Sequence, residues 1–375
     1  MACFLAGLWA LVCPRTATSQ DHNFAGSLQT NYLWVPDQGE ARAQAFDSFT
    51  NELALKVAVD FSPTLSANVK LCYGCHGLEV DMAFANLRVG DLLNIRLGRF
   101  NPSFGDFPAR HDPANHRAAD KPLPYDMGQM LRMRDYNLGV IPAPYVDQGL
   151  EVYGTHWFDD VAQLTYALYA LSGLQAEQTG LDLNFSAGRA PYYTDNNSEP
   201  AIGGRLTLTF QSSADVIFTV GGSAMAGRAD PGRDHAYHLV GSDLYLRLYA
   251  LELHAEYLLR RTEFAVTANP DSRFRYGPDA AGQYADYFLK DGFYVEADLL
   301  PSRYLEFILR VDGLRRRGNV AISSPLQKRS TVMRYTLGAN VLVESSVRIK
   351  LSGEFYRFSD FDNQAAGNLG VTAAF

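Results

Sequence analysis

Five consecutive residues, Cys72-Tyr73-Gly74-Cys75-His76, have the types and the spacing to do chemistry. Two thiols separated by two residues can add to the two vinyl groups of haem, and a histidine directly after them can bind the iron from one side. We therefore expect Cys72 and Cys75 to hold one haem c covalently, with His76 as its proximal iron ligand.

Two other interpretations of this motif stay open. A disulfide between Cys72 and Cys75 could close a tight turn in an oxidising compartment. A zinc site could combine Cys72, Cys75 and His76 with a loop histidine, since structural zinc takes four such ligands. The motif resembles the haem-attachment site of c-type cytochromes over these five residues only, and no cytochrome helix surrounds it.

A low-spin haem needs a second axial ligand, which we expect in the long segment 101–146. That segment contains two histidines, and we expect His111 or His116 to be the distal ligand. The alternative is that both are loop histidines exposed to water. The segment also contains three methionines, Met127, Met130 and Met133.

The start of the chain predicts export from the cytoplasm. Residues 1–12 are mostly apolar, and Ala17-Thr18-Ser19 is a small-x-small cleavage site before Gln20, although the usual basic start is missing. We expect residues 1–19 to be a signal peptide and residues 20–375 to be the mature chain. Cleavage leaves Cys72 and Cys75 as the cysteines of the mature chain.

Apolar and polar residues alternate along many segments, which is the pattern of half-buried β-strands. Segments 53–61, 251–259, 305–312 and 347–356 all show it. The last of them places Val347, Ile349, Leu351 and Phe355 on one face and Arg348, Lys350, Ser352 and Glu354 on the other. Elsewhere, no interior stretch has the roughly 20 apolar residues of a spanning helix.

The connections between these segments alternate between short and long, which distinguishes a membrane barrel from a soluble sandwich. Outer-membrane barrels have short periplasmic turns and long extracellular loops. A terminal Phe375 closes the last alternating segment. We therefore expect an all-β, antiparallel transmembrane barrel of about 16 strands in the bacterial outer membrane. Short turns are expected at 62–64, 90–92, 158–160, 211–213, 248–250, 301–303 and 344–346, and long loops at 36–47, 101–146, 173–200, 227–237, 262–290 and 317–328.

The same alternation of short and long connections places the cysteine motif at the extracellular rim. The turns near Ser62 and Gly90 are both short and so both periplasmic, and the motif lies midway between them. The outward face should continue through Leu65, Ala67, Val69 and Leu71, and then through Leu78, Val80, Met82 and Phe84. Segment 101–146, which is rich in proline, should be a long extracellular or lumen-folded loop.

The segment Gly98-Arg99-Phe100-Asn101-Pro102-Ser103-Phe104-Gly105 resembles the glycine-aromatic and Pro-Phe-Gly sequence of the porin O and P family. The likeness is local, about 30 residues with the preceding hairpin, and the proline stands one place early. The resemblance implies a general diffusion or anion-selective porin and a possible homotrimer. We do not expect this chain to share the phosphate selectivity of that family, because the expected lumen-facing charges are mixed in sign.

Two functions therefore compete. The first is a haem-bearing, porin-like barrel in electron transfer at the outer membrane, with a partner cytochrome because one haem cannot bridge a core of about 25–30 Å. The alternative is a passive diffusion porin for small solutes, with Cys72 and Cys75 as a disulfide. No catalytic constellation such as Gly-x-Ser-x-Gly stands out, so an enzyme is the weaker expectation. The net charge of −8 argues against a nucleic-acid partner and leaves lipid and solutes.

Overall fold

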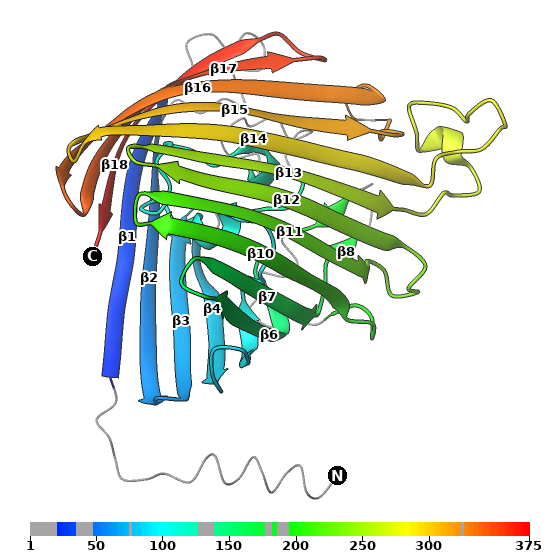
Figure 1. The fold of residues 1–375 in the computed structure, drawn as a ribbon. Helices are drawn as coiled ribbons and strands as arrows, with labels where there is room; N and C mark the ends of the chain where they lie inside the picture. Colours follow the sequence, from blue (N-terminus) through cyan, green and yellow to red (C-terminus); the bar gives the residue numbers. More distant parts are fainter. Residues whose placement is uncertain are drawn as a thin grey trace, which may run out of the picture.

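The computed structural model describes residues 21–34, 48–74, 77–126, 139–176, 182–185, 195–322, 324 and 326–375. In this part of the chain, sixteen antiparallel strands form one closed barrel (Figure 1), which confirms the expected strand number. The barrel strands are β1 (Asp21–Trp34), β2 (Ser48–Ser62), β3 (Leu65–Gly74), β4 (Gly77–Arg88), β5 (Asn94–Phe100), β6 (Asp147–Phe158), β7 (Ala162–Leu171), β10 (Ala201–Ser213), β11 (Val216–Arg228), β12 (Ala236–Leu248), β13 (Leu251–Glu263), β14 (Tyr287–Ser302), β15 (Leu305–Arg317), β16 (Arg329–Glu344), β17 (Val347–Phe358) and β18 (Gln364–Ala374).

The remaining elements are short. The strands β8 (Gln175–Ala176) and β9 (Leu183–Asn184) form a separate two-stranded sheet. In the described parts of the connections there are three 3₁₀ turns, η2 (Phe107–Arg110), η3 (Leu123–Tyr125) and η6 (Pro270–Ser272). Among the described residues, no helix has the length and apolar character to cross a membrane.

The alternation of the sequence becomes the two faces of the barrel wall. Along β17, Leu351 is 58% exposed on the outside, whereas its neighbour Lys350 is 1% exposed and faces the lumen. The same holds on β15, where Leu309 faces out and Arg310 faces in. Because the outer face is apolar around a closed barrel, hydrocarbon is the environment that it fits.

Seven short turns lie at the end of the barrel that also holds the start of β1 and the end of β18. The long connections lie at the opposite end, as the alternation of lengths predicts, and Figure 1 shows one of them projecting beyond β14. Most short turns fall where expected. The strand β10 continues to Ser213, so its turn is Ala214-Asp215 and begins three residues later than expected.

The predicted outward face of β4 is wrong in its second half. Lys70 on β3 pairs with Met82, but the next residue, Leu71, pairs with Val80, so Asp81 is an extra residue in a β-bulge. A bulge of one residue reverses the alternation beyond it. Leu78 and Val80 face outward as expected, whereas Met82 and Phe84 line a cavity inside the barrel.

The barrel closes through the pairing of β1 with β18. Gly26 and Phe375 exchange two backbone hydrogen bonds, of 2.8 Å from the Gly26 nitrogen and 3.0 Å from the Phe375 nitrogen. The ring of Phe375 also occupies the space above Gly26, because a Cβ atom added there would lie 2.4 Å from Phe375 Cζ and 2.8 Å from the Ala54 oxygen. The terminal phenylalanine is thus part of the closing seam.

We expect Gly26→Val to destabilise the folded barrel, because the added side chain must displace the Phe375 ring or the backbone of β2. Overpacking of this kind costs about 1–3 kcal/mol. Urea unfolding in detergent micelles measures the change. Gly353→Val is the matched control, since a Cβ atom at Gly353 meets no atom within 4 Å. Equal unfolding midpoints for the two variants would contradict this account of the seam.

Candidate functional site

The long connection after β5 folds into the lumen of the barrel. Its entry uses Gly98 (φ +129°) and Gly105 (φ +69°), both in backbone conformations that favour glycine. A Cβ atom at Gly105 would lie 2.1 Å from the Tyr125 hydroxyl and 2.3 Å from Glu256 Oε1. The glycines that carry the porin-like sequence pattern are therefore required where the chain turns inward. We call residues 101–126 the lumen loop.

A buried carboxylate of β13 holds the first turn of the lumen loop. Glu256 Oε1 accepts hydrogen bonds from the Asp106 nitrogen at 3.0 Å and from the Tyr125 hydroxyl at 2.5 Å. Its Oε2 accepts a longer bond of 3.4 Å from the Phe107 nitrogen. One side chain of the wall thus joins two separate parts of the loop.

Two buried arginines, two and three strands away from β13, share one loop carboxylate. Arg310 of β15 and Arg334 of β16 each form an ion pair with Asp120, and Arg334 also pairs with Asp312. Asp312 Oδ2 in turn accepts a 2.8 Å hydrogen bond from the Leu123 nitrogen. These four charged side chains are 0–1% exposed, so each depends on its partners for compensation.

Loop carbonyls and one loop arginine complete the attachment. Lys350 Nζ donates to three backbone oxygens of the loop, those of Pro113 (2.8 Å), His116 (2.9 Å) and Ala118 (3.2 Å). Arg117 points back to the wall and pairs with three carboxylates, Glu252, Asp298 and Glu306, at 2.7, 3.1 and 3.3 Å. The loop is therefore held from several strands at once.

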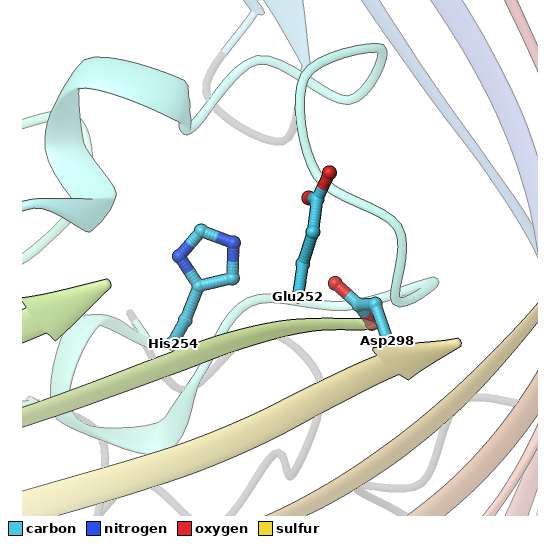
Figure 2. A group of neighbouring side chains, drawn as sticks. All are labelled: Glu252, His254 and Asp298. Carbon is cyan, nitrogen blue, oxygen red and sulfur yellow. The ribbon is translucent and has the colours of Figure 1, made fainter. Parts of the chain in front are cut away.

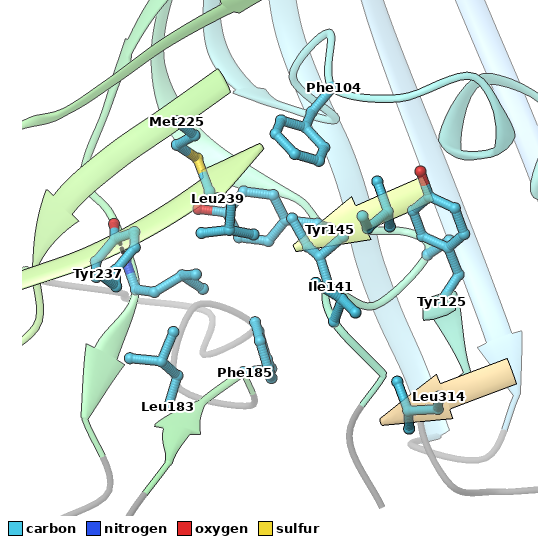
Figure 3. Close-up of a cluster of buried hydrophobic side chains, with 14 of the residues drawn as sticks. Phe104, Tyr125, Ile141, Tyr145, Leu183, Phe185, Met225, Tyr237, Leu239 and Leu314 are labelled. Carbon is cyan, nitrogen blue, oxygen red and sulfur yellow. Dashed lines mark hydrogen bonds between the residues drawn. The ribbon is translucent and has the colours of Figure 1, made fainter. Parts of the chain in front are cut away.

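An apolar cluster packs the connection after β5 against the lumen side of the wall, with members on strands from β7 to β17. Phe104, Tyr125 and Ile141 of the connection pack there with Met225 of β11 and Leu239 of β12, as Figure 3 shows. The lumen is thus not polar throughout, although the alternation of the sequence predicts charged side chains that face it. Water is excluded where the loop meets this part of the wall.

A cavity of about 530 Å³ remains between the loop and strands β1 to β5. Its charged lining is mostly cationic, with Lys56, Lys70, Arg96 and Arg205 beside Asp112. A second cavity of about 260 Å³ lies on the other side of the loop, next to Arg117, Glu252 and His254. These are spaces that the described loop leaves open in the lumen.

The first cysteine of the Cys-x-x-Cys-His motif faces the lumen. Cys72 on β3 pairs with Ala54 and Glu79, and its partly buried thiol is free and lies 3.6 Å from Asp81 Oδ2. Cys75 and His76 lie outside the described residues, in the connection between β3 and β4. Met127, Met130 and Met133 also lie outside them. The described ends of the hairpin, Gly74 and Gly77, pair with each other at the long-loop rim, as parity predicts.

His111 lies beside Lys70 and Asp112. Lys70 also pairs with Asp81, which contacts Cys72. The Nε2 atom of His111 is 2.7 Å from Lys70 Nζ, and its Nδ1 is 2.5 Å from the Pro108 oxygen. A lysine ammonium only donates, and a carbonyl oxygen only accepts, so the ring is neutral with its proton on Nδ1. Both nitrogens are occupied, so an iron bond from His111 would require one of these contacts to break.

His116 is buried on a different side of the loop. Its Nδ1 contacts the Ala118 oxygen at 3.0 Å, its ring packs against Phe107, and it borders the smaller cavity with Arg117. The structure thus places His111, and not His116, beside Lys70 and Asp81 near the motif. The alternative of water-exposed histidines is wrong, because His111 is 4% and His116 is 3% exposed.

Sequence reasoning did not single out a buried group formed by Glu252, His254 and Asp298 (Figure 2). Their ligand-type atoms lie within 4.8 Å of one another, and the residue types suit a divalent metal. Arg117, however, already donates to both carboxylates. The group therefore acts as an anchor for the loop. The only sequence signal for it was the lumen-facing parity of each strand, which does not show which residues meet.

Comparisons with known proteins give the class of the fold. No protein-family model and no curated protein sequence matches the chain. Among solved structures, OmpF of Salmonella typhi in complex with daunomycin is similar, with a TM-score of 0.58 and 13% identity, covering 94% of this chain and 97% of that one. An anion-selective porin from Comamonas acidovorans has a TM-score of 0.55 and 11% identity, with 95% of this chain and 100% of that one covered. The trimer form of OmpT from Vibrio cholerae has a TM-score of 0.52 and 11% identity, with 96% of this chain and 99% of that one covered.

The chain thus has the fold of bacterial outer-membrane porins. The similarity covers nearly the whole of each chain, and in the described part of this chain that length forms the closed sixteen-stranded barrel. Together with the apolar outer face, this places the protein in the bacterial outer membrane, as expected from the sequence.

The burial of His111 predicts a pH dependence of loop docking. Burial and the nearby charge of Lys70 lower the pKa of His111 to about 4, against the opposing effect of Asp112. The other charged groups that act on it are Lys121 of the loop and Asp81 of the wall. An undocked histidine with a pKa near 6.5 takes up its proton first as the pH falls. Docking therefore weakens between about pH 6.5 and pH 4, by about 3 kcal/mol in total.

We expect the single-channel conductance of the protein to change across this pH window, and His111→Gln to flatten the change while keeping an acceptor for Lys70. His235→Gln is the control, because His235 is a histidine of another connection, 3.3 Å from Asp230. A pH profile that is the same in wild type and His111→Gln between pH 6.5 and pH 4 would rule out His111 as the responsible group.

Proposed function

We propose that this protein is a passive diffusion channel for small solutes, in which the lumen loop sets the size limit. The observation that carries the proposal is the loop held across the lumen by buried ion pairs, with open cavities beside it. A loop fixed in this way narrows the barrel without closing it. The porins with similar folds support the same class of function.

The proposed assembly is a homotrimer in outer-membrane lipid. The support is the similar fold of OmpT from Vibrio cholerae, which is described in a trimer form, together with the porin-like sequence around Gly98–Gly105. Small solutes and membrane lipid are then the partners of the channel.

The size limit can be tested by releasing the loop. Asp120→Asn removes the counter-charge that Arg310 and Arg334 share, and breaking a buried pair costs about 3–5 kcal/mol. We expect proteoliposomes with wild-type protein to swell in small sugars only, and the variant to admit larger ones. The control is Glu199→Gln, whose 3.8 Å pair with Arg228 is exposed. No swelling by the wild-type protein with any solute would refute the channel.

A second candidate function is electron transfer by a covalently bound haem c. The specific observation in its favour is the placement of Cys72 of the Cys-x-x-Cys-His motif, which faces the lumen at the long-loop rim. Cys72 and Cys75 would hold the haem and His76 would bind its iron, which would supply a one-electron redox centre for a partner cytochrome. His111 is the nearer candidate for a distal ligand, and His116 the more distant one. A Cys72–Cys75 disulfide is the competing state.

Haem staining of a denaturing gel separates these states. We expect the haem-bearing form to stain at the mass of the mature chain and the Cys72→Ser variant to lose the stain. A disulfide form gives no stain but gains two reactive thiols after reduction. An unstained wild-type band, alongside stained control cytochromes from the same cells, removes the haem proposal and leaves the channel proposal intact.

A further inference from the structure

Five arginines face outward at the long-loop end of neighbouring strands. Each stands within three residues of the strand end, on β13, β15, β16 or β17. The register pairs Arg317 with Arg329 directly, and Arg315 lies two residue pairs further from the strand ends, at the next outward position. They form what we call the arginine face, which consists of Arg261, Arg315, Arg317, Arg329 and Arg357.

The arginine face has more positive than negative charge. Arg315 binds Asp291 through two hydrogen bonds of 2.7 and 3.0 Å, and Arg317 reaches the same carboxylate at 3.5 Å. Arg261 pairs with Glu263. Arg329 and Arg357 form no ion pair with any residue in the described part of the chain.

The outward positions of these strand ends therefore carry five guanidinium groups and only two carboxylates. Lys328 adds a further cation directly before β16, while Asp360 and Asp362 lie beyond the strand ends in the β17–β18 connection. This surplus is unusual in a chain whose net charge is −8. It is local to one side of the barrel, since the same rim carries Trp34 on β1 and Leu78 on β4 as exposed apolar residues.

The lipid-facing belt begins directly beside the arginine face. Arg357 pairs with Met333, and the next outward pair on the same two strands is Tyr335 with Phe355. These two aromatic side chains are 43% and 46% exposed. The next outward residue on β16, Leu337, is 69% exposed. Aromatic residues mark the boundary between hydrocarbon and headgroups. The guanidinium groups thus lie at the depth of the headgroups.

We propose that the arginine face binds the phosphate groups of an anionic lipid headgroup in the outer leaflet. A planar guanidinium group binds phosphate with two parallel hydrogen bonds, and each arginine near an anionic surface adds to the affinity. The apolar belt alongside accommodates the acyl chains of the same molecule, which a free anion lacks. The ligand class is therefore a phosphorylated lipid, and its site is independent of the lumen.

The experiment uses the full protein in detergent micelles, with diphosphorylated lipid A as the probe and native mass spectrometry as the readout. The double variant Arg329→Gln, Arg357→Gln removes the two unpaired cations and leaves Asp291 and Glu263 with their partners. We expect its dissociation constant to rise about thirtyfold. Arg303→Gln is the control, because Arg303 is exposed at the opposite rim, where it donates to the Tyr304 hydroxyl.

Two results would overturn the proposal. One is an unchanged affinity in the double variant, and the other is complete displacement of lipid A by millimolar inorganic phosphate, which would identify a site for free anions. The double variant should still swell proteoliposomes in small sugars, so a failure of lipid binding is distinguishable from a failure of the channel.

Discussion

The structure depends on the closure of the sheet between β1 and β18. Lipid offers no partner for a backbone N–H or C=O group, so an open edge would leave a row of them unsatisfied. Here the edges pair over eight residues from Ser27 to Trp34, and Phe375 extends the seam by two more backbone bonds to Gly26. Closure then fixes which side chains face lipid and which face the lumen.

Inside the closed wall, buried ion pairs act together with the apolar cluster to hold the lumen loop. A buried charge costs several kcal/mol unless it is paired. The arginines of β15 and β16 and the lysine of β17 find their partners in the lumen loop, and the loop finds its own in the wall. Each side therefore makes the other stable, and the space that they leave becomes the proposed path for solutes.

The cysteine motif and the arginine face lie at the same end of the barrel but in different environments. Cys72 faces the lumen, whereas Arg357 faces outward, and each follows from the parity of its strand. The rim thus carries a lumen-facing cysteine on its inner surface and outward arginines on its outer surface. The lumen loop lies on the inner side of the wall, beside the lumen-facing side chains.

The sequence by itself determined the barrel. Two local properties of the sequence predict it: apolar and polar residues alternate with a period of two, and short connections alternate with long ones. Both can be recognised without knowing which strands pair. They gave the strand number, the lumen-facing side of β17 and the rim at which Gly74 and Gly77 pair. They also marked the Gly98–Gly105 segment at which the loop turns inward.

The tertiary structure decided what depends on residues far apart in the chain. The bulge at Asp81 reversed the second half of β4, because register is set by pairing between strands and not by the residues of one strand. The path of the lumen loop followed from Asp120 finding Arg310 and Arg334, about 190 and 214 residues away. For the same reason, the sequence named His111 and His116 together, and only the folded chain separated them.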